Sequence, residues 1–311
     1  MPSDYVREEA VANNLLFILA GEGSNGLQLW RSDGTDEGTF RLADNYQIQA
    51  SNPTYLTSAG TFVCFRMIYQ NDNWLFRSDG TNEGTYPLHK LSNSGSTFWG
   101  IGNINGTMFF SGAQDAGGRQ LWKTDGTIAG TQLVKDFGIS NKGETGPEQF
   151  FNFNGKLSFV IHNEEEIDVD AVLWQSDGTE AGTVPGPALS DGFIQPAVMG
   201  NYVYFPEGSS LKRSDGKTIT TVKDGFIWLR QPFVVGQSIY FSANHAGSGE
   251  ELWKSDGTAE GTALVKDIVS GAEDSDPTGF TDVAGTLFSK RSRQATGGCG
   301  KVMAVPREQS R

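Results

Sequence analysis

Six aspartates recur in one sequence context and are the first residues whose chemistry needs explaining. Each is followed by glycine and preceded by Ser or Thr: Asp33, Asp79, Asp125, Asp177, Asp215 and Asp256. Carboxylates gathered at one point could bind a metal ion or transfer protons. Successive spacings of 46, 46, 52, 38 and 41 residues instead place one aspartate in each unit of a repeat, too far apart to share an ion. Because Asp-Gly between two β-rich runs is a strong hairpin signal, we predict that these aspartates shape turns.

A second acidic set lies in HNEEEIDVDA, residues 162–171. Its weak metal candidates are Glu164, Glu166, Asp168 and Asp170, whose oxygens could bind calcium. Their spacing lacks the Asp-x-Asp-x-Asp-Gly order of a calcium loop, so a solvated acidic loop is the favoured interpretation. Apart from calcium as a possibility, the sequence predicts no cofactor.

No catalytic constellation is visible. The histidines His89, His162 and His245 fall in different repeats without metal spacing, and no Ser/His/Asp motif is present. Cys64 and Cys299 give neither a disulfide framework nor a zinc motif. The sequence therefore predicts a protein that is not an enzyme. The alternative is a propeller glycosidase or polysaccharide lyase with an acidic channel site, for which Asp115 and the segment 164–170 supply the clustered acids.

Several residues could instead bind a sugar. Recognition of a glycan needs an aromatic face beside polar groups that orient hydroxyls. The candidates are Trp99, Trp228, Arg119, Asp115 and His245. Trp99 and Trp228 stand outside the repeat, each ahead of an expected innermost strand, although filling the rim of a channel would also explain them. The repeated Trp30, Trp122, Trp174 and Trp253 alternate with Leu, which predicts packing between neighbouring repeats.

The element that must position all these residues is the repeat ELWKSDGTAEGTALVK, Glu251 to Lys266, present in six copies. A short apolar run, a turn and an alternating run form a hairpin signature. Two more strand-like runs precede each hairpin, so one repeat is a four-stranded antiparallel meander, with strands here called a to d. A unit of 40 to 50 residues of this kind is a propeller blade.

Second strands are expected to begin near Leu15, Thr61, Thr107, Lys156, Tyr202, Ser238 and Thr286. The fold class is thus all-β, a β-propeller of seven blades with an incomplete or frameshifted seventh; six blades is the alternative. We expect one propeller domain over residues 1–288 and an anomalous tail over 289–311. Reading the tail's codons one base earlier permits the missing hairpin, which suggests an out-of-frame remnant. Cys299 and the basic residues after Ser289 are discounted for that reason.

Loops of a propeller alternate between two faces. The similar c–d turns all fall on one face, and the dissimilar b–c and d–a loops fall on the other. Function normally resides on variable loops held by a rigid scaffold, so we expect a glycan or a surface protein to bind there.

Composition limits the classes of partner. A formal charge of −13 argues against nucleic acid, and no run approaches the ~18 apolar residues of a membrane span. The N-terminus MPSDYVREEAVANN lacks a signal-peptide pattern and aligns with the interior of a blade, with strands expected at residues 5–12 and 15–20. Such a start is compatible with a fragment of an exported protein. Oligomeric state is not indicated.

The repeats resemble those of bacterial ELWxxDGT-repeat proteins over nearly the whole chain except the tail. The match rests on Leu252-Trp253, Asp256-Gly257-Thr258, Gly261-Thr262 and Val265-Lys266-Asp267. The resemblance implies a propeller-like protein that is secreted or at the cell surface, and it carries no catalytic residues across. The fifth repeat departs from it, with Lys212 at the Trp position and no Gly-Thr.

Overall fold

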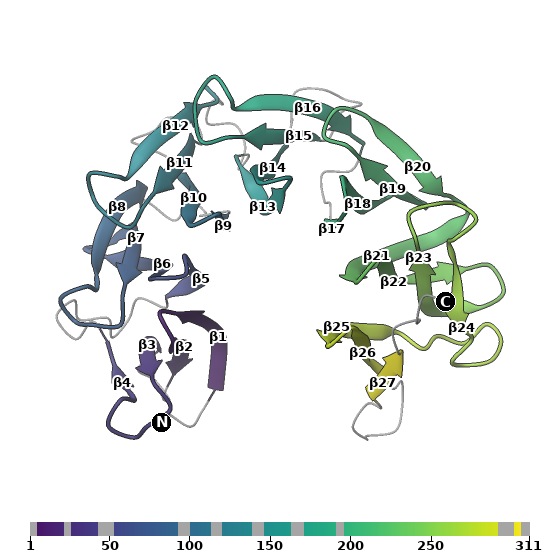
Figure 1. Cartoon of the computed structure of the whole chain (residues 1–311), viewed down its shortest axis with the longest axis horizontal. Coiled ribbons are helices and arrows are strands. Elements are labelled where there is room, and N and C mark those ends of the chain that lie inside the picture. Colours follow the sequence, from purple (N-terminus) through teal and green to yellow (C-terminus); the bar gives the residue numbers. More distant parts are fainter. Residues whose placement is uncertain are drawn as a thin grey trace. The chain divides into compact units, whose positions relative to one another are not determined.

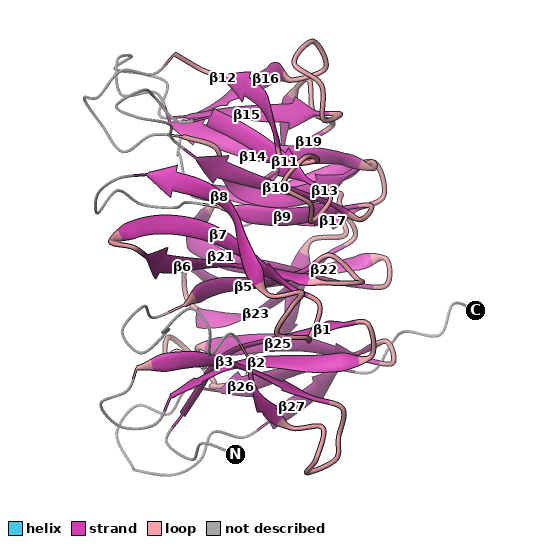
Figure 2. Ribbon diagram, turned by 90° about the vertical axis from the view of Figure 1, so that its left-hand side faces the viewer, coloured by secondary structure: helices cyan, strands magenta, loops and turns pink. Residues whose placement is uncertain are grey.

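The computed structural model describes residues 5–21, 26–42, 53–92, 100–112, 120–138, 146–162, 171–190, 196–291 and 302–305. All regular elements in these ranges are β-strands (Figure 2), and none of these residues belongs to a helix that could span a membrane. The chain divides into two compact units, which are residues 1–166 with 174–185, and residues 167–173 with 186–311.

The first unit holds three blades and most of a fourth, each a sheet of four antiparallel strands in sequence order (Figure 1). Blade one contains β1 (Tyr5–Ala12), β2 (Leu15–Gly21), β3 (Leu27–Ser32) and β4 (Phe40–Arg41). Blade two contains β5 (Thr54–Ser58), β6 (Val63–Tyr69), β7 (Asp72–Ser78) and β8 (Tyr86–Ser92). Blade three contains β9 (Ile101–Ile104), β10 (Thr107–Gly112), β11 (Gln120–Thr124) and β12 (Gln132–Asp136). Blade four contains β13 (Glu148–Phe153), β14 (Lys156–His162), β15 (Ala171–Ser176) and β16 (Val184–Leu189).

The second unit holds the remaining sheets. Blade five contains β17 (Ala197–Met199), β18 (Tyr202–Glu207), β19 (Ser210–Ser214) and β20 (Ile219–Lys223). Blade six contains β21 (Phe226–Val235), β22 (Ser238–His245), β23 (Gly249–Ser255) and β24 (Ala263–Lys266). Blade seven contains β25 (Pro277–Val283), β26 (Thr286–Arg291) and β27 (Val302–Val305), and is three-stranded in the part of the chain that is described. The protein is therefore a seven-bladed β-propeller, as the repeat predicts, and three strands of its last blade lie in the described residues.

Most predicted strands lie where the sequence put them. The expected N-terminal strand 5–12 is β1, and six of the seven second strands begin at the predicted residue. The exception is β6, which begins at Val63 rather than Thr61 because Ala59 N donates to Phe62 O (2.8 Å) in a longer turn. The tail, which has no hairpin pattern, nevertheless contributes β27, paired with β26 from Leu287↔Val305 to Lys290↔Val302.

The repeated turn is a closed hydrogen-bond network. In blade six, Asp256 Oδ1 accepts from Thr258 N (2.9 Å) and from Thr258 Oγ1 (2.7 Å). Thr258 Oγ1 in turn accepts from Gly261 N (3.0 Å). Ser255 Oγ accepts from Gly257 N (3.0 Å) and bonds Thr262 Oγ1 (2.7 Å). Equivalent aspartate–threonine bonds occur at Asp33–Thr35, Asp79–Thr81, Asp125–Thr127 and Asp177–Thr179. The aspartates therefore act as turn formers, as predicted.

Two glycines of this turn are required for different reasons. Gly257 has φ +94°, the left-handed region in which a side chain is unfavourable. Gly261 needs no such φ, but a Cβ there would stand 2.0 Å from Asp256 Oδ1. Glycine is therefore required at position 261 because the Asp256 carboxylate occupies the space that a side chain would need.

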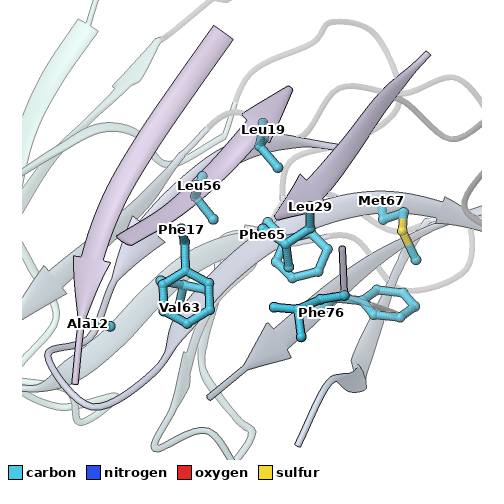
Figure 3. Packing of buried hydrophobic residues seen from close by; sticks show 10 residues of the cluster. Ala12, Phe17, Leu19, Leu29, Leu56, Val63, Phe65, Met67 and Phe76 are labelled. Carbon is cyan, nitrogen blue, oxygen red and sulfur yellow. The ribbon is translucent and has the colours of Figure 1, made fainter. Parts of the chain in front are cut away.

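In blades three and six the Leu-Trp pair of the repeat packs in two directions, as predicted from its alternation. Leu121 joins the buried cluster that blade three shares with blade four, whereas Trp122 joins the cluster shared with blade two. Leu252 and Trp253 divide in the same way between blades seven and five. Figure 3 shows the corresponding cluster of blades one and two, in which Phe17, Phe65 and Phe76 are fully buried. Burial of this apolar surface between sheets is the main stabilising term of such a fold.

In blades one, two, three and five, the residue after the Trp position of the repeat links consecutive turns; that position holds Trp30, Phe76, Trp122 and Lys212. Its cationic side chain donates to the glycine carbonyl of the next blade's turn: Arg31 to Gly80 (3.3 Å), Arg77 to Gly126 (3.4 Å), Lys123 to Gly178 (2.9 Å) and Arg213 to Gly257 (3.0 Å). These bonds give the c–d face its regularity.

Blade five replaces the Trp contact with an ion pair. Lys212 Nζ binds the buried Glu207 carboxylate, whose other oxygen accepts from Ser190 N (2.8 Å). Burial alone would raise the pKa of Glu207, but the Lys212 and Ser190 hydrogen bonds hold it below its ordinary value. The hairpin of this blade is also tighter, because only residues 215–218 connect β19 to β20, whereas residues 256–262 connect β23 to β24.

Candidate functional site

Many of the sequence-predicted site residues lie outside the described residues. These are Trp99, Asp115, Arg119, Glu164, Glu166, Asp168 and Asp170. The acidic segment 163–170 connects β14 to β15, the b and c strands of blade four. Trp228 and His245 are described, and both belong to blade six.

Trp228 lies inside its strand rather than ahead of it, which corrects the prediction. β21 begins at Phe226 and is ten residues long, whereas the other described innermost strands have three to eight. The extension is possible because β21 bulges twice, between Phe226 and Trp228 and between Arg230 and Phe233. Bulges add residues to one strand and re-aim side chains, which is why they concentrate near functional sites.

His245 and Trp228 point to opposite faces of the sheet, so the structure does not bring these two candidates together. His245 pairs with Phe226 and packs on the Trp253 ring, with 5.4 Å between centroids, on the side that carries the cluster shared with blade five. Trp228 pairs with Asn244, which pairs with Glu250. Directly opposed residues share a face, so Trp228, Asn244 and Glu250 form one row.

Arg230 is the centre of this second face. It stands two residues after Trp228, and its guanidinium carbon lies 4.8 Å from the indole centroid. Arg230 Nη2 donates to Glu250 Oε1 (2.7 Å) and to Asp276 Oδ1 (2.6 Å), and Nε donates to Glu250 Oε1 (3.2 Å). Ser242, its cross-strand neighbour, donates its hydroxyl to Glu250 Oε1. Trp228, Arg230, Ser242, Glu250 and Asp276 are called the Arg230 cluster below.

The cluster combines a buried acid with an accessible cation. The Glu250 side chain is 5% exposed, the Asp276 side chain 34% and the Arg230 side chain 43%. Burial raises the pKa of Glu250, the nearby Asp276 charge adds to this, and the bonds from Ser242 and Arg230 oppose it. Arg230 therefore pairs with an interior acid while its side chain remains partly exposed.

The segment after β24 fixes the acids in place. Asp274 Oδ1 accepts from Glu250 N (2.6 Å), and Ser275 donates both to Glu250 O (3.0 Å) and to Glu251 Oε2 (2.8 Å). Gly249 admits this segment, since a Cβ there would meet Glu273 O at 2.4 Å. Asp276 has φ +47° immediately before Pro277, an unfavourable conformation of the kind that accumulates at ligand sites.

Sequence reasoning missed Arg230, Glu250 and Asp276. One sequence feature could have indicated them: the strand-forming residues FIWLRQ before Pro232, which lengthen the innermost strand of blade six. Glu250 immediately precedes the repeat, so the sequence alone places it with the variable b–c loop of blade six. Nothing in the spacing pairs Arg230 with an acid 46 positions later.

Within the described ranges, no group of three or more His, Cys, Asp or Glu side chains has a geometry that could hold a metal ion. The other two histidines have structural partners. His89 lies on the Trp122 ring, with 4.2 Å between centroids, and burial lowers its pKa. His162 Nε2 lies 2.7 Å from Glu148 Oε1. The Cys64 thiol is buried, which raises its pKa to about 12 and makes it unreactive.

Comparisons with known proteins support the fold. No protein-family model and no curated protein sequence matches the chain. Among solved structures, the β-propeller domain of the Trilobed protease from Pyrococcus furiosus is similar, with a TM-score of 0.52 and 9% identity over 96% of this chain and 92% of that one. That domain has an open velcro topology.

Two longer proteins are also similar. Prolyl oligopeptidase B from Galerina marginata gives a TM-score of 0.60 with 11% identity over 97% of this chain and 49% of that one. A prolyl endopeptidase gives 0.56 with 15% identity, over 97% and 48%. The chain thus spans about half the length of these peptidases. Likeness at such identity establishes a β-propeller and nothing of its chemistry.

Proposed function

We propose that the chain is a non-catalytic binding module whose variable-loop face binds a glycan at the Arg230 cluster. The observation that carries the proposal is the row of Trp228, Arg230 and Asn244 along one face of β21 and β22, with carboxylates behind it. An indole ring can stack on a sugar face, and guanidinium, amide and carboxylate groups can bond its hydroxyls. All these groups belong to strands or to a segment tied to a strand, which limits the entropy lost on binding.

The position of the cluster agrees with the expected working face. Glu250 is the second residue of β23, directly after the b–c turn 246–248, and Asp276 ends the d–a connection before β25. The repeated Ser-Asp-Gly-Thr turns lie at the opposite ends of the same strands. A binding site at the variable-loop end leaves the turns to their structural role.

Catalysis is the second candidate, because Glu250 has a raised pKa and stands near a second acid. A glycosidase needs the sugar's scissile bond between its two carboxyl groups. Here Arg230 Nη2 bonds Glu250 and Asp276 at once, so the guanidinium occupies that space. The arrangement favours holding a sugar over cleaving it. An acid pair in the segments 113–119 and 163–170 is the remaining enzymatic alternative.

The proposal also covers the setting of the protein. A carbohydrate-binding propeller that resembles the ELWxxDGT-repeat proteins would work outside the cell or at its surface. A surface protein carrying glycans would be its natural partner. The peptidase activity named for the longer similar proteins is not part of the proposal, because the chain matches only about half of each.

A glycan array probed with the labelled protein tests this function. We expect binding of a defined oligosaccharide class by the wild type and loss of that binding in Trp228→Ala. Ile227→Ser is the matched control. The Ile227 side chain is next to Trp228 in the sequence, lies in the bulge, is 64% exposed and is not part of the row. Turnover of a bound oligosaccharide, abolished by Asp115→Asn or Glu250→Gln, would show that the protein is an enzyme instead.

A further inference from the structure

A second arginine occupies the corresponding place in blade two. Arg66 lies in the row Thr54↔Arg66↔Leu75, and Arg230 lies in the row Arg230↔Ser242↔Leu252. Leu75 and Leu252 are the same position of the repeat, and each faces the following blade. The two arginines therefore stand at one level of their sheets, on the equivalent face, on strands b and a respectively.

Both arginines donate hydrogen bonds through Nε and Nη2, and in each case the acceptor is the residue two positions before the repeat leucine. Arg230 donates Nε and Nη2 to Glu250, and Arg66 donates Nε (2.9 Å) and Nη2 to Asn73 Oδ1. The blade-two partner is a neutral amide. Burial partly desolvates the Arg66 guanidinium, which lowers its pKa. No carboxylate among the described residues is bonded to it.

In blade six the outer side of the arginine is occupied by a carboxylate from the lead-in to the next blade, Asp276. The corresponding lead-in to blade three, Asn93 to Ile104, contains no Asp or Glu. The acid nearest to Arg66 along β7, Asp72, is paired instead with Lys90 at 2.8 Å. Among the described residues, the blade-two arginine thus has the inner partner of this arrangement but no carboxylate in the place of Asp276; the other described residue that acts on its charge is Tyr55, a phenol.

An unbonded hydroxyl marks the same spot. Thr54 Oγ1 is buried and has no hydrogen-bond partner in the structure, although Thr54 directly opposes Arg66 on the same sheet face. A buried hydroxyl without a partner costs about 1–3 kcal/mol, so such groups call for a specific reason. A ligand oxygen beside Arg66 would supply the missing partner.

We infer that Arg66 and Thr54 form a site for the carboxylate of an acidic ligand, which takes the place that Asp276 fills in blade six. The planar guanidinium matches a carboxylate through two parallel N–H bonds, and the Thr54 hydroxyl donates a third. The site lies in the first unit and is separate from the Arg230 cluster, so it extends the proposed function without depending on it.

Equilibrium dialysis with radiolabelled D-glucuronate tests the inference, using the whole chain. We expect saturable binding by the wild type, competition by acetate and none by D-glucose. Arg66→Gln should abolish binding, and Arg66→Lys, which keeps the charge but loses the planar fork, should weaken it at least tenfold. Thr54→Val should weaken binding severalfold while leaving the melting temperature equal or higher, since it removes an unbonded buried hydroxyl.

Trp228→Ala is the control that separates the two proposals, because it should leave glucuronate binding unchanged even where glycan-array binding is lost. Equal binding by Arg66→Gln and the wild type would overturn the inference. Competition by inorganic phosphate as strong as that by acetate would show a general anion site rather than one for carboxylates. Binding that arises only in Asp115→Asn would show that the chain's own acid fills the place.

Discussion

The turn aspartates act through hydrogen bonds that only the ionised carboxylate makes well. Bonds from the Thr hydroxyl and backbone amide lower the pKa of Asp33, Asp125, Asp177 and Asp256 below the ordinary 3.8. A lowered folded-state pKa adds stability that is complete above the unfolded value and is lost as pH falls through the folded value. Glu250, with its raised pKa, contributes in the opposite direction.

We therefore predict a melting temperature that is nearly constant down to about pH 4 and falls below it. Replacing the four aspartates by Asn should flatten this acid limb, because the amide oxygen still accepts from Thr but no longer titrates. Thermal unfolding followed by circular dichroism between pH 2 and 7 measures it. An unchanged acid limb in the Asn variant would assign acid unfolding to other groups.

The glycine and aspartate of one turn should be coupled. Gly261→Ala is expected to destabilise by about 1–3 kcal/mol, because its methyl group overlaps the Asp256 carboxylate. In an Asp256→Ala background the same change should cost much less, since the obstructing group is gone. Urea unfolding of the two single variants and the double variant gives the coupling free energy. Additive effects would show that the glycine is needed for another reason.

At the scale of the element, blade five tests whether the repeated Trp can be restored. Lys212→Trp matches the other repeats, yet it removes the cation bonded to buried Glu207. We predict destabilisation by about 2 kcal/mol, in the range for breaking a charged hydrogen bond. Glu207→Leu in the same chain should recover most of the loss by removing the stranded acid. Urea unfolding decides; a single Lys212→Trp variant as stable as the wild type would contradict the account.

Elements of the repeat were predictable because local and global signals agree in them. Asp-Gly turns, Leu-Trp alternation and the run lengths all specify the same hairpin, and the structure contains it in six blades. The Arg230 cluster was not predictable, because it depends on two bulges and on a contact between β21 and the segment before β25. Neither feature has a local signature beyond a longer run of strand-forming residues.

At the scale of the whole molecule, blade seven should be the least protected sheet in the described part of the chain. It has three described strands, and β25 is largely exposed, whereas β6 and β22, the second strands of blades two and six, are largely buried. We predict faster amide exchange in β25 and β26 than in β6 and β22, since opening free energy follows buried contacts. Hydrogen exchange with mass spectrometry measures this. Equal protection would argue that the last blade is complete.

The fold class was predictable because a repeat constrains every blade at once. The third strand of the final blade was not predictable from the sequence. β27 pairs with β26 through a segment that has no resemblance to the repeat. Backbone pairing can be satisfied by many sequences, so a strand can form where the side-chain pattern predicts none. Resequencing the gene remains the direct test of whether the tail after Ser289 is an out-of-frame remnant.

The central claim is that the variable-loop face binds ligand and the c–d face does not. The most direct measurement is titration calorimetry of the best oligosaccharide from the array against the wild type, Trp228→Ala and Asp256→Asn. We predict that Trp228→Ala weakens binding at least tenfold, as loss of a stacking aromatic does, with an unchanged melting temperature. Asp256→Asn should bind as the wild type does. Full binding by Trp228→Ala together with loss of binding in a folded Asp256→Asn variant would contradict the account.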